Sequence, residues 1–214
     1  MASLRVVLAG FFALAAARPA PAPLVFKRAG ATSAVDIVTA IMPSTTSCAG
    51  AAFPAECATA DQAAPYLVGA MAQYGLYDAA VIAGVLALTA YESGELKFRH
   101  NINPGTPGKG TSNMQMLHFN EAYAASIPAL ATGLAAVQAA GSDPDAVLAL
   151  VTADAYNFGS GAWFLATQCG ADVRTQLAAG TDAGFAAYMG CVGTDITEPG
   201  RLEYWHAALS AFGL

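Results

Sequence analysis

Glu92 combines the side chain and the position that acid catalysis requires. It follows an apolar run, residues 79 to 91, that we expect to form a buried helix opened by Asp78. At the end of such a helix, burial and the negative end of the helix dipole both disfavour a charged carboxylate. An acid that keeps its proton can donate it to a leaving oxygen, as glycoside cleavage requires. The sequence therefore indicates Glu92 as a general acid. The alternative is that Glu92 marks where the helix reaches water.

A second carboxylate would be needed to activate water in an inverting glycosidase, at about 6.5–9.5 Å from the first. Glu95 is the nearest acid in the sequence, one helical turn beyond Glu92. Gly94 is expected to end the helix first, so that Glu95 enters a loop as a solvated charge. Glu95 is therefore the weaker catalytic candidate, and Asp61 and Glu121 stay open as more distant ones.

Other reaction types find little support in the sequence. His100, His118 and His206 share no metal-binding spacing, and no Gly-x-Ser-x-Gly elbow or phosphate-binding loop is present. We therefore expect neither a metal nor a cofactor. The formal net charge of -6 also argues against nucleic acid as a partner, because phosphate binding needs clustered Lys and Arg.

The composition favours an α-rich fold. Hydrophobic residues make up 56% of the chain and charged residues 11%, and much of the apolar fraction is alanine and glycine. A Gly/Pro-rich segment at residues 94–110 indicates a long loop, which is often functional. Expected helices span about residues 61–74, capped by Asp61, 79–91, a stretch from 120, 128–140, 144–157, 162–168, 173–179, 183–188 and 199–212.

The N-terminal part has the pattern of processing segments. Residues 1–17 have the basic start, apolar run and small residues of a signal peptide, and residues 18–28 indicate a pro-segment that ends at the dibasic pair Lys27-Arg28. Residues 29–60 are expected to form a loop region, and residues 61–214 a single helical domain. We therefore expect a secreted, extracellular protein with no membrane contact once the signal peptide is removed.

Four cysteines are expected to form two disulfides in an oxidising compartment. They are Cys48, Cys57, Cys169 and Cys191. Three pairings are possible, and proximity in the sequence favours Cys48–Cys57 and Cys169–Cys191. A metal site is the rival interpretation, but the chain has no C-x-x-C spacing and no histidine near a cysteine.

Three short segments together resemble goose-type lysozymes and soluble lytic transglycosylases. They are Tyr-Glu-Ser-Gly at 91–94, Gly-Thr-Ser-Asn-Met-Gln-Met at 110–116 and Ala-Tyr-Asn-Phe-Gly at 155–159. The resemblance implies an all-α, single lysozyme-like domain with an active-site loop, in which Glu92 is the acid. Met114 and Gln115 would line the substrate cleft, with Tyr156 and Asn157 across from the acid. The chain departs from the family at Ser112-Asn113, where Gly-Leu is common.

This resemblance implies a secreted glycosidase, muramidase-like or chitinolytic, that cleaves β-1,4 links between N-acetylated amino sugars. Its expected partner is a polysaccharide, peptidoglycan or chitin, and the protein is expected to be a monomer. Hydrolysis and lytic transglycosylation both stay open. A non-catalytic glycan-binding protein or effector on the same scaffold is the alternative, and a purely structural domain is a weaker third.

Overall fold

The computed structural model describes residues 32–214 of the chain. The signal peptide predicted at residues 1–17 and the pro-segment predicted at 18–28 lie outside the described residues.

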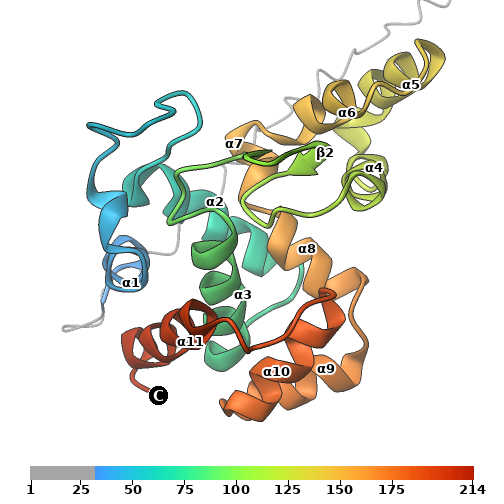
Figure 1. Cartoon of the computed structure of the whole chain (residues 1–214). Helices are drawn as coiled ribbons and strands as arrows, with labels where there is room; N and C mark the ends of the chain where they lie inside the picture. Colours follow the sequence, from blue (N-terminus) through green and yellow to red (C-terminus); the bar gives the residue numbers. More distant parts are fainter. Residues whose placement is uncertain (1–31) are drawn as a thin grey trace, which may run out of the picture. The chain divides into compact units, whose positions relative to one another are not determined.

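The described chain is almost entirely helical, as expected (Figure 1). The all-α prediction is confirmed, and the sheet is limited to one two-stranded hairpin. The helical elements are α1 (Ala34–Ile41), η1 (Pro43–Thr46), α2 (Ala60–Gln73), α3 (Ala79–Glu92), α4 (Leu117–Ala125), η2 (Pro128–Leu130), α5 (Ala131–Ala139), α6 (Pro144–Val151), α7 (Asp154–Asn157), α8 (Ser160–Thr167), α9 (Ala171–Ala178), α10 (Asp182–Cys191) and α11 (Pro199–Phe212).

Helix α3 lies at the centre of these elements, with α11, α9, α8 and α1 packed around it (Figure 1). Ten of its fourteen residues are buried, which agrees with the absence of a polar face in its sequence. Gly84 allows α9 to approach closely, because a Cβ at this position would lie 2.9 Å from the side chain of Leu177. The small residues of α3 therefore serve helix packing.

Side-chain caps explain where the first three helices begin. Asp78 accepts hydrogen bonds from the amides of Ala80 and Val81 and opens α3 as predicted. Helix α2 begins at a capping box on Thr59, slightly before the expected cap Asp61. A second capping box, on Ser33, opens α1. The expectation of a loop throughout 29–60 was therefore wrong.

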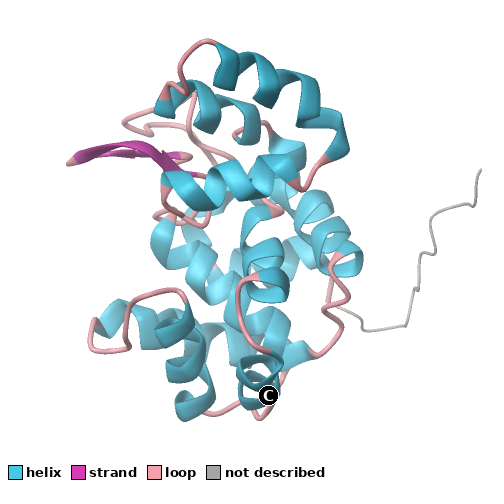
Figure 2. Cartoon of the chain, turned by 90° about the vertical axis from the view of Figure 1, so that its right-hand side faces the viewer, coloured by secondary structure: helices cyan, strands magenta, loops and turns pink. Residues whose placement is uncertain are grey.

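The expected loop at 94–110 contains an antiparallel hairpin, β1 (His100–Ile102) and β2 (Gly105–Gly110), which projects from one side of the helices (Figure 2). Apolar and polar residues do not alternate in this segment, so only a loop was predicted. Gly110 is required at the end of β2, because a Cβ there would lie 2.5 Å from the carbonyl oxygen of Arg99.

The single helix expected over residues 144–157 is divided in two. Helix α6 ends at Val151, and residues 154–157 form the separate helix α7.

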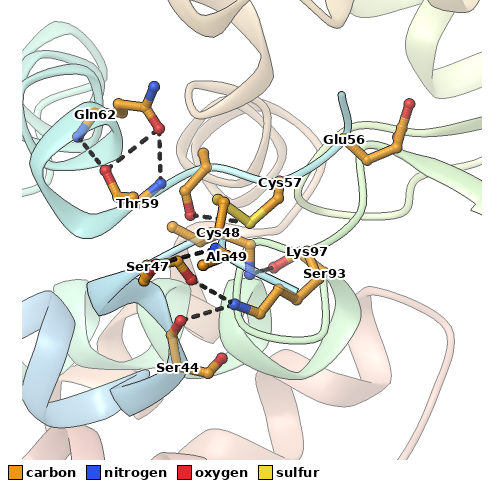
Figure 3. The surroundings of a disulfide bond; sticks show 12 residues. Ser44, Ser47, Cys48, Ala49, Glu56, Cys57, Thr59, Gln62, Ser93 and Lys97 are labelled. Carbon is orange, nitrogen blue, oxygen red and sulfur yellow. Dashed lines mark hydrogen bonds between the residues drawn. A yellow bond between two sulfur atoms is a disulfide. The ribbon is translucent and has the colours of Figure 1, made fainter. Parts of the chain in front are cut away.

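The two disulfides join the cysteines that are nearest in sequence, Cys48 to Cys57 and Cys169 to Cys191. The first holds the loop between η1 and α2 (Figure 3). Lys97 ties the same loop to the chain after α3, because its ammonium group donates to the carbonyl oxygens of Ser44 and Ser47 at 2.7 and 3.2 Å (Figure 3). The second disulfide joins the ends of α8 and α10.

Among residues 32–214, no single helix is long and apolar enough to cross a membrane. Two consecutive helical segments, Leu117–Ala125 and Pro128–Ala139, are together long and apolar enough by length and composition alone, but the chain bends by 103° between them.

Candidate ligand-binding cleft

Glu92 is the last residue of α3, and the chain turns sharply after it. The Ser93 hydroxyl donates to the carbonyl of Thr89 at 2.6 Å and accepts from the amide of Leu96 at 2.8 Å. The next three residues, Gly94, Glu95 and Leu96, all have left-handed backbone angles, with φ of 56°, 58° and 61°. Two of these are not glycine, so the turn carries a conformational cost. After this turn, the Glu95 carboxylate contacts Ser44 and Tyr204 rather than Glu92.

Glu95 lies outside the cleft and has a structural role. Its carboxylate accepts hydrogen bonds from the Tyr204 hydroxyl at 2.8 Å and from the Ser44 amide at 2.7 Å. Burial alone would raise the pKa of Glu95, but these hydrogen bonds and the charge of Lys97 outweigh it and hold the pKa below its ordinary value. The predicted second catalytic carboxylate is therefore a bridge between η1 and α11.

Arg201 from α11 forms an ion pair with Glu92, with 2.9 Å between Nη1 and Oε1. Both side chains are largely buried, at 10% exposure for Arg201 and 20% for Glu92. The guanidinium carbon also lies 4.2 Å from the centre of the Tyr91 ring. From its place in the sequence Glu92 was expected to end a buried helix, and the structure places the Arg201 cation directly against its carboxyl group.

Two connected hollows lie on either side of Glu92. They share Glu92, Lys109 and Met114, and their volumes are about 310 and 360 Å³. The first is further lined by Leu88, Asn113, Gln115, Met116, Phe119, Phe164, Val192, Gly193, Thr194 and Arg201. The second is further lined by Phe53, Phe98, His100, Asn101, Ile102 and Asn103. We call the two hollows together the Glu92 cleft.

The floor of the Glu92 cleft is the buried turn from Thr111 to Gln115, which Asn157 holds in place. The Asn157 side-chain oxygen accepts from the Ser112 amide at 3.0 Å, and its carbonyl accepts from the Ser112 hydroxyl at 2.8 Å. Gln115 donates to the Asn120 side chain at 2.8 Å. Gln115 therefore lines the Glu92 cleft, whereas Asn157 supports the turn from below.

Two residues that line the Glu92 cleft carry a buried side-chain atom without a hydrogen-bond partner. Within residues 32–214, the buried side-chain atoms that lack a hydrogen-bond partner are Asn113 Oδ1, the Tyr188 hydroxyl and Arg201 Nε. Asn113 and Arg201 line the cleft. Burial raises the pKa of Tyr188, and the nearby charge of Glu92 raises it further. A buried polar atom without a partner costs about 1–3 kcal/mol, and two of the three atoms belong to residues that line the cleft.

The hairpin wall of the cleft is fixed to the first disulfide loop. Glu56, next to Cys57, accepts from the Arg99 amide at 2.9 Å and pairs with His100 Nδ1 at 2.7 Å. The Arg99 guanidinium continues this link to Asp154, at the start of α7. The disulfide therefore holds the strand that places His100 in the second hollow.

Tyr156 does not face Glu92. It lines a separate pocket with three other tyrosines, between α2, α4 and α7. The structure thus brings Glu92, Met114 and Gln115 together, and it places Glu95, Tyr156 and Asn157 elsewhere.

Sequence reasoning missed the cations and aromatic rings of the cleft. Arg201 had one local signal: it stands in the first turn of α11, where a cation is unfavourable unless it has a partner elsewhere. No local pattern indicated Lys109 or Phe98, because their positions depend on the hairpin and on the turn that precedes it.

The described chain is thus a mainly α-helical domain with two disulfides and a polar cleft at the end of its central helix. A curated relative from Fusarium oxysporum (strain Fo5176), named bifunctional dioxygenase (DOX)-epoxy alcohol synthase (EAS), is 48% identical over 158 residues. The match covers 72% of this chain and 12% of the relative, so the chain spans only a small part of that protein. No protein-family model matches the chain, and no solved structure matches it.

These comparisons contradict the assignment to goose-type lysozymes and lytic transglycosylases, and with it the predicted glycosidase. The relative's name describes oxidative chemistry rather than hydrolysis, and no family model or solved structure of a lysozyme-like protein matches the chain. The alternative of a non-catalytic glycan-binding protein on a lysozyme-like scaffold falls with it. The three motifs are short, and the structure gives two of their residues other roles: Asn157 supports a turn and Tyr156 lines another pocket.

Proposed function

We propose that the described domain binds a small organic anion with an apolar body in the Glu92 cleft. The observation that carries the proposal is the charge of the cleft. It contains the ammonium of Lys109 and the guanidinium of Arg201, against the single carboxylate of Glu92. The rest of the domain is strongly acidic, so two cations in one cleft are a marked exception.

The described part of the chain is acidic as a whole, in contrast to the cleft. Four of the nine basic residues of the chain precede residue 32, and all fifteen acidic residues follow it, so the described part has a formal net charge of -10. The ion pairs of residues 32–214 include Glu92 with Arg201, and none includes Lys109. Lys109 therefore carries the unmatched positive charge that an anionic group would meet.

The remaining lining suits an apolar body. Leu88, Met114, Phe119 and Phe164 line the first hollow, and Phe98 lines the second. Burying a methylene group against such side chains contributes about 0.8 kcal/mol. The side-chain amides of the cleft can meet oxygen functions on the same molecule. The ligand is thus amphipathic: an anionic group, a carbon skeleton and hydrogen-bonding oxygens.

The name of the Fusarium relative supports this ligand class, because it refers to the synthesis of an epoxy alcohol. An epoxy alcohol carries an epoxide and a hydroxyl on a carbon skeleton, which is the same mixture of polar and apolar groups. The oxidative activities are named for the whole relative, of which this chain spans 12%. We therefore propose a binding role for this domain. We further propose that it works in an oxidising, extracellular setting, which the two disulfides support.

Titration calorimetry with decanoate and its uncharged counterpart decanol tests the binding role. The native domain is expected to bind decanoate more tightly than decanol. Lys109→Met removes the unmatched charge, so decanoate binding is expected to weaken roughly fivefold to tenfold, which corresponds to about 1–1.4 kcal/mol, while decanol binding stays unchanged.

Arg174→Met is the matched control, because it removes one positive charge from α9, outside the cleft. Equal affinity for the two ligands would contradict the proposal. So would decanoate binding that Lys109→Met leaves unchanged, since the anion would then bind elsewhere, for example in the apolar pocket between α1, α2, α3 and α11.

A further inference from the structure

A pocket of about 310 Å³ between α2, α4 and α7 is lined by four tyrosines, and the proposed function does not use it. Tyr66 and Tyr74 come from α2 and its C-cap, Tyr123 from α4 and Tyr156 from α7. We call it the tyrosine pocket. Of the eight tyrosines in the sequence, half therefore line one hollow, a concentration that core packing alone does not require.

Neighbouring groups hold the side chains of Tyr123 and Tyr66 in place. The Tyr123 hydroxyl donates to the carbonyl oxygen of Tyr156 at 2.8 Å, which joins α4 to α7. Gly159 makes room for that hydroxyl, because a Cβ there would lie 2.7 Å from it. The Tyr66 ring stacks on Phe158 with 6.1 Å between ring centres. The pocket is therefore largely formed before any ligand arrives.

The tyrosine pocket offers aromatic rings without formal charge. Within the described chain, none of its lining residues is Asp, Glu, Lys, Arg or His. Burial raises the pKa of Tyr74, and it raises the pKa of Tyr123 further, helped by the neighbouring Tyr74 and Tyr156. The phenols of Tyr74 and Tyr123 therefore stay neutral. What the pocket lining supplies is aromatic ring surface, which carries negative charge on its faces, together with hydroxyl oxygens.

This chemistry selects among ligands. A metal ion or a primary ammonium is strongly hydrated and needs carboxylates to replace its water, and the pocket has none. An anion would meet the negative ring faces and the acidic domain around them. A quaternary ammonium group is weakly hydrated and binds ring faces without an ionic partner. From this combination we infer that the tyrosine pocket binds an organic cation of the quaternary ammonium class.

Choline and 3,3-dimethylbutan-1-ol form a matched pair of probes, since they differ mainly in the positive charge. Calorimetry on the native domain is expected to show choline binding roughly tenfold tighter than the neutral alcohol. Tyr66→Leu removes a ring at a position that is 40% exposed, so folding is preserved, and choline binding is expected to weaken roughly tenfold. Tyr66→Phe keeps the ring and is expected to bind within about twofold of the native domain.

Two control variants show whether the tyrosine pocket itself holds the choline. Tyr77→Leu removes an exposed tyrosine outside the pocket and is expected to leave choline binding unchanged. Lys109→Met tests independence from the Glu92 cleft and is also expected to leave it unchanged. The inference is overturned if choline does not bind, if the neutral alcohol binds equally well, or if Tyr66→Leu and Tyr77→Leu have the same effect.

Discussion

Arg201 Nη1 lies 2.9 Å from Glu92 Oε1, although the two residues are 109 positions apart in the sequence. The pair joins the end of the central helix to α11, and its largely buried setting limits screening by water. Most of the Glu92 cleft is built around it.

Replacement of Arg201 by methionine is expected to destabilise the domain by about 2–4 kcal/mol, because it leaves the Glu92 carboxylate partly buried without a partner. Urea denaturation measures the change. The double variant Glu92→Gln with Arg201→Met is expected to recover part of this loss, since the uncompensated charge is gone. A cost below about 0.5 kcal/mol for the single variant would show that the pair does not stabilise the fold.

Acid stability depends in part on Glu95. Its pKa is lower in the folded domain than its ordinary value of 4.5. A carboxyl with a lowered folded pKa contributes stability above its unfolded pKa and loses that contribution as the pH falls through the folded pKa. Native and Glu95→Gln domains are therefore expected to differ most in stability near neutral pH and to converge as the pH falls from the ordinary pKa of 4.5 through the lower folded pKa. Urea midpoints measured from pH 7 to pH 3 check this, and a constant difference would contradict it.

The two disulfides are expected to stabilise the domain unequally. They close loops with sequence separations of 9 and 22 residues. By the chain-entropy relation, removing Cys48–Cys57 costs about 2.7 kcal/mol and removing Cys169–Cys191 about 3.4 kcal/mol. Paired Cys→Ser variants compared in urea test this order. Removing Cys48–Cys57 is expected to have a second effect, because Glu56 directly precedes Cys57 and accepts the hydrogen bond from the Arg99 amide. Hydrogen exchange at the Arg99 amide should therefore become faster.

Asn157 is expected to affect ligand binding without lining the cleft. Asn157→Ala leaves the buried amide of Ser112 without its acceptor, at a cost of about 1–3 kcal/mol, and loosens the turn that carries Met114 and Gln115. Both stability and decanoate affinity should fall. The exposed Asn103→Ala, at the hairpin, serves as the matched control for stability. Unchanged decanoate affinity in a folded Asn157→Ala domain would mean that the turn does not shape the cleft.

Local signals predicted most helices well. The apolar run before Glu92 and the Asp78 cap indicated α3, and residues 199–212 match α11 at both ends. The first helix was missed although Ser33 and Asp36 form a capping box, a signal that local sequence does contain. The hairpin could not be found in the same way. Both strands are short, β2 is rich in glycine, and the start of the hairpin is held by Glu56 and Arg99 from outside the strands.

The candidate site was less predictable, because its electrostatics come from distant parts of the chain. The position of Glu92 at a helix end could be predicted, but the cation beside it comes from the last helix. The left-handed backbone at Glu95 turns that side chain away, and the propensity of glutamate does not favour such a conformation. Three short motifs in the right order were insufficient to assign a family, since each also fits ordinary turns and caps.

Helix α7 is only four residues long, yet two of its consecutive side chains face different sites. Tyr156 forms a wall of the tyrosine pocket, while Asn157 supports the turn beneath the Glu92 cleft. Because one short turn carries both, any movement of α7 in response to an occupant on one side would also displace the residue on the other side. Thermodynamic linkage then requires the influence to be mutual: whatever choline does to the affinity for decanoate, decanoate must do to the affinity for choline, by the same factor.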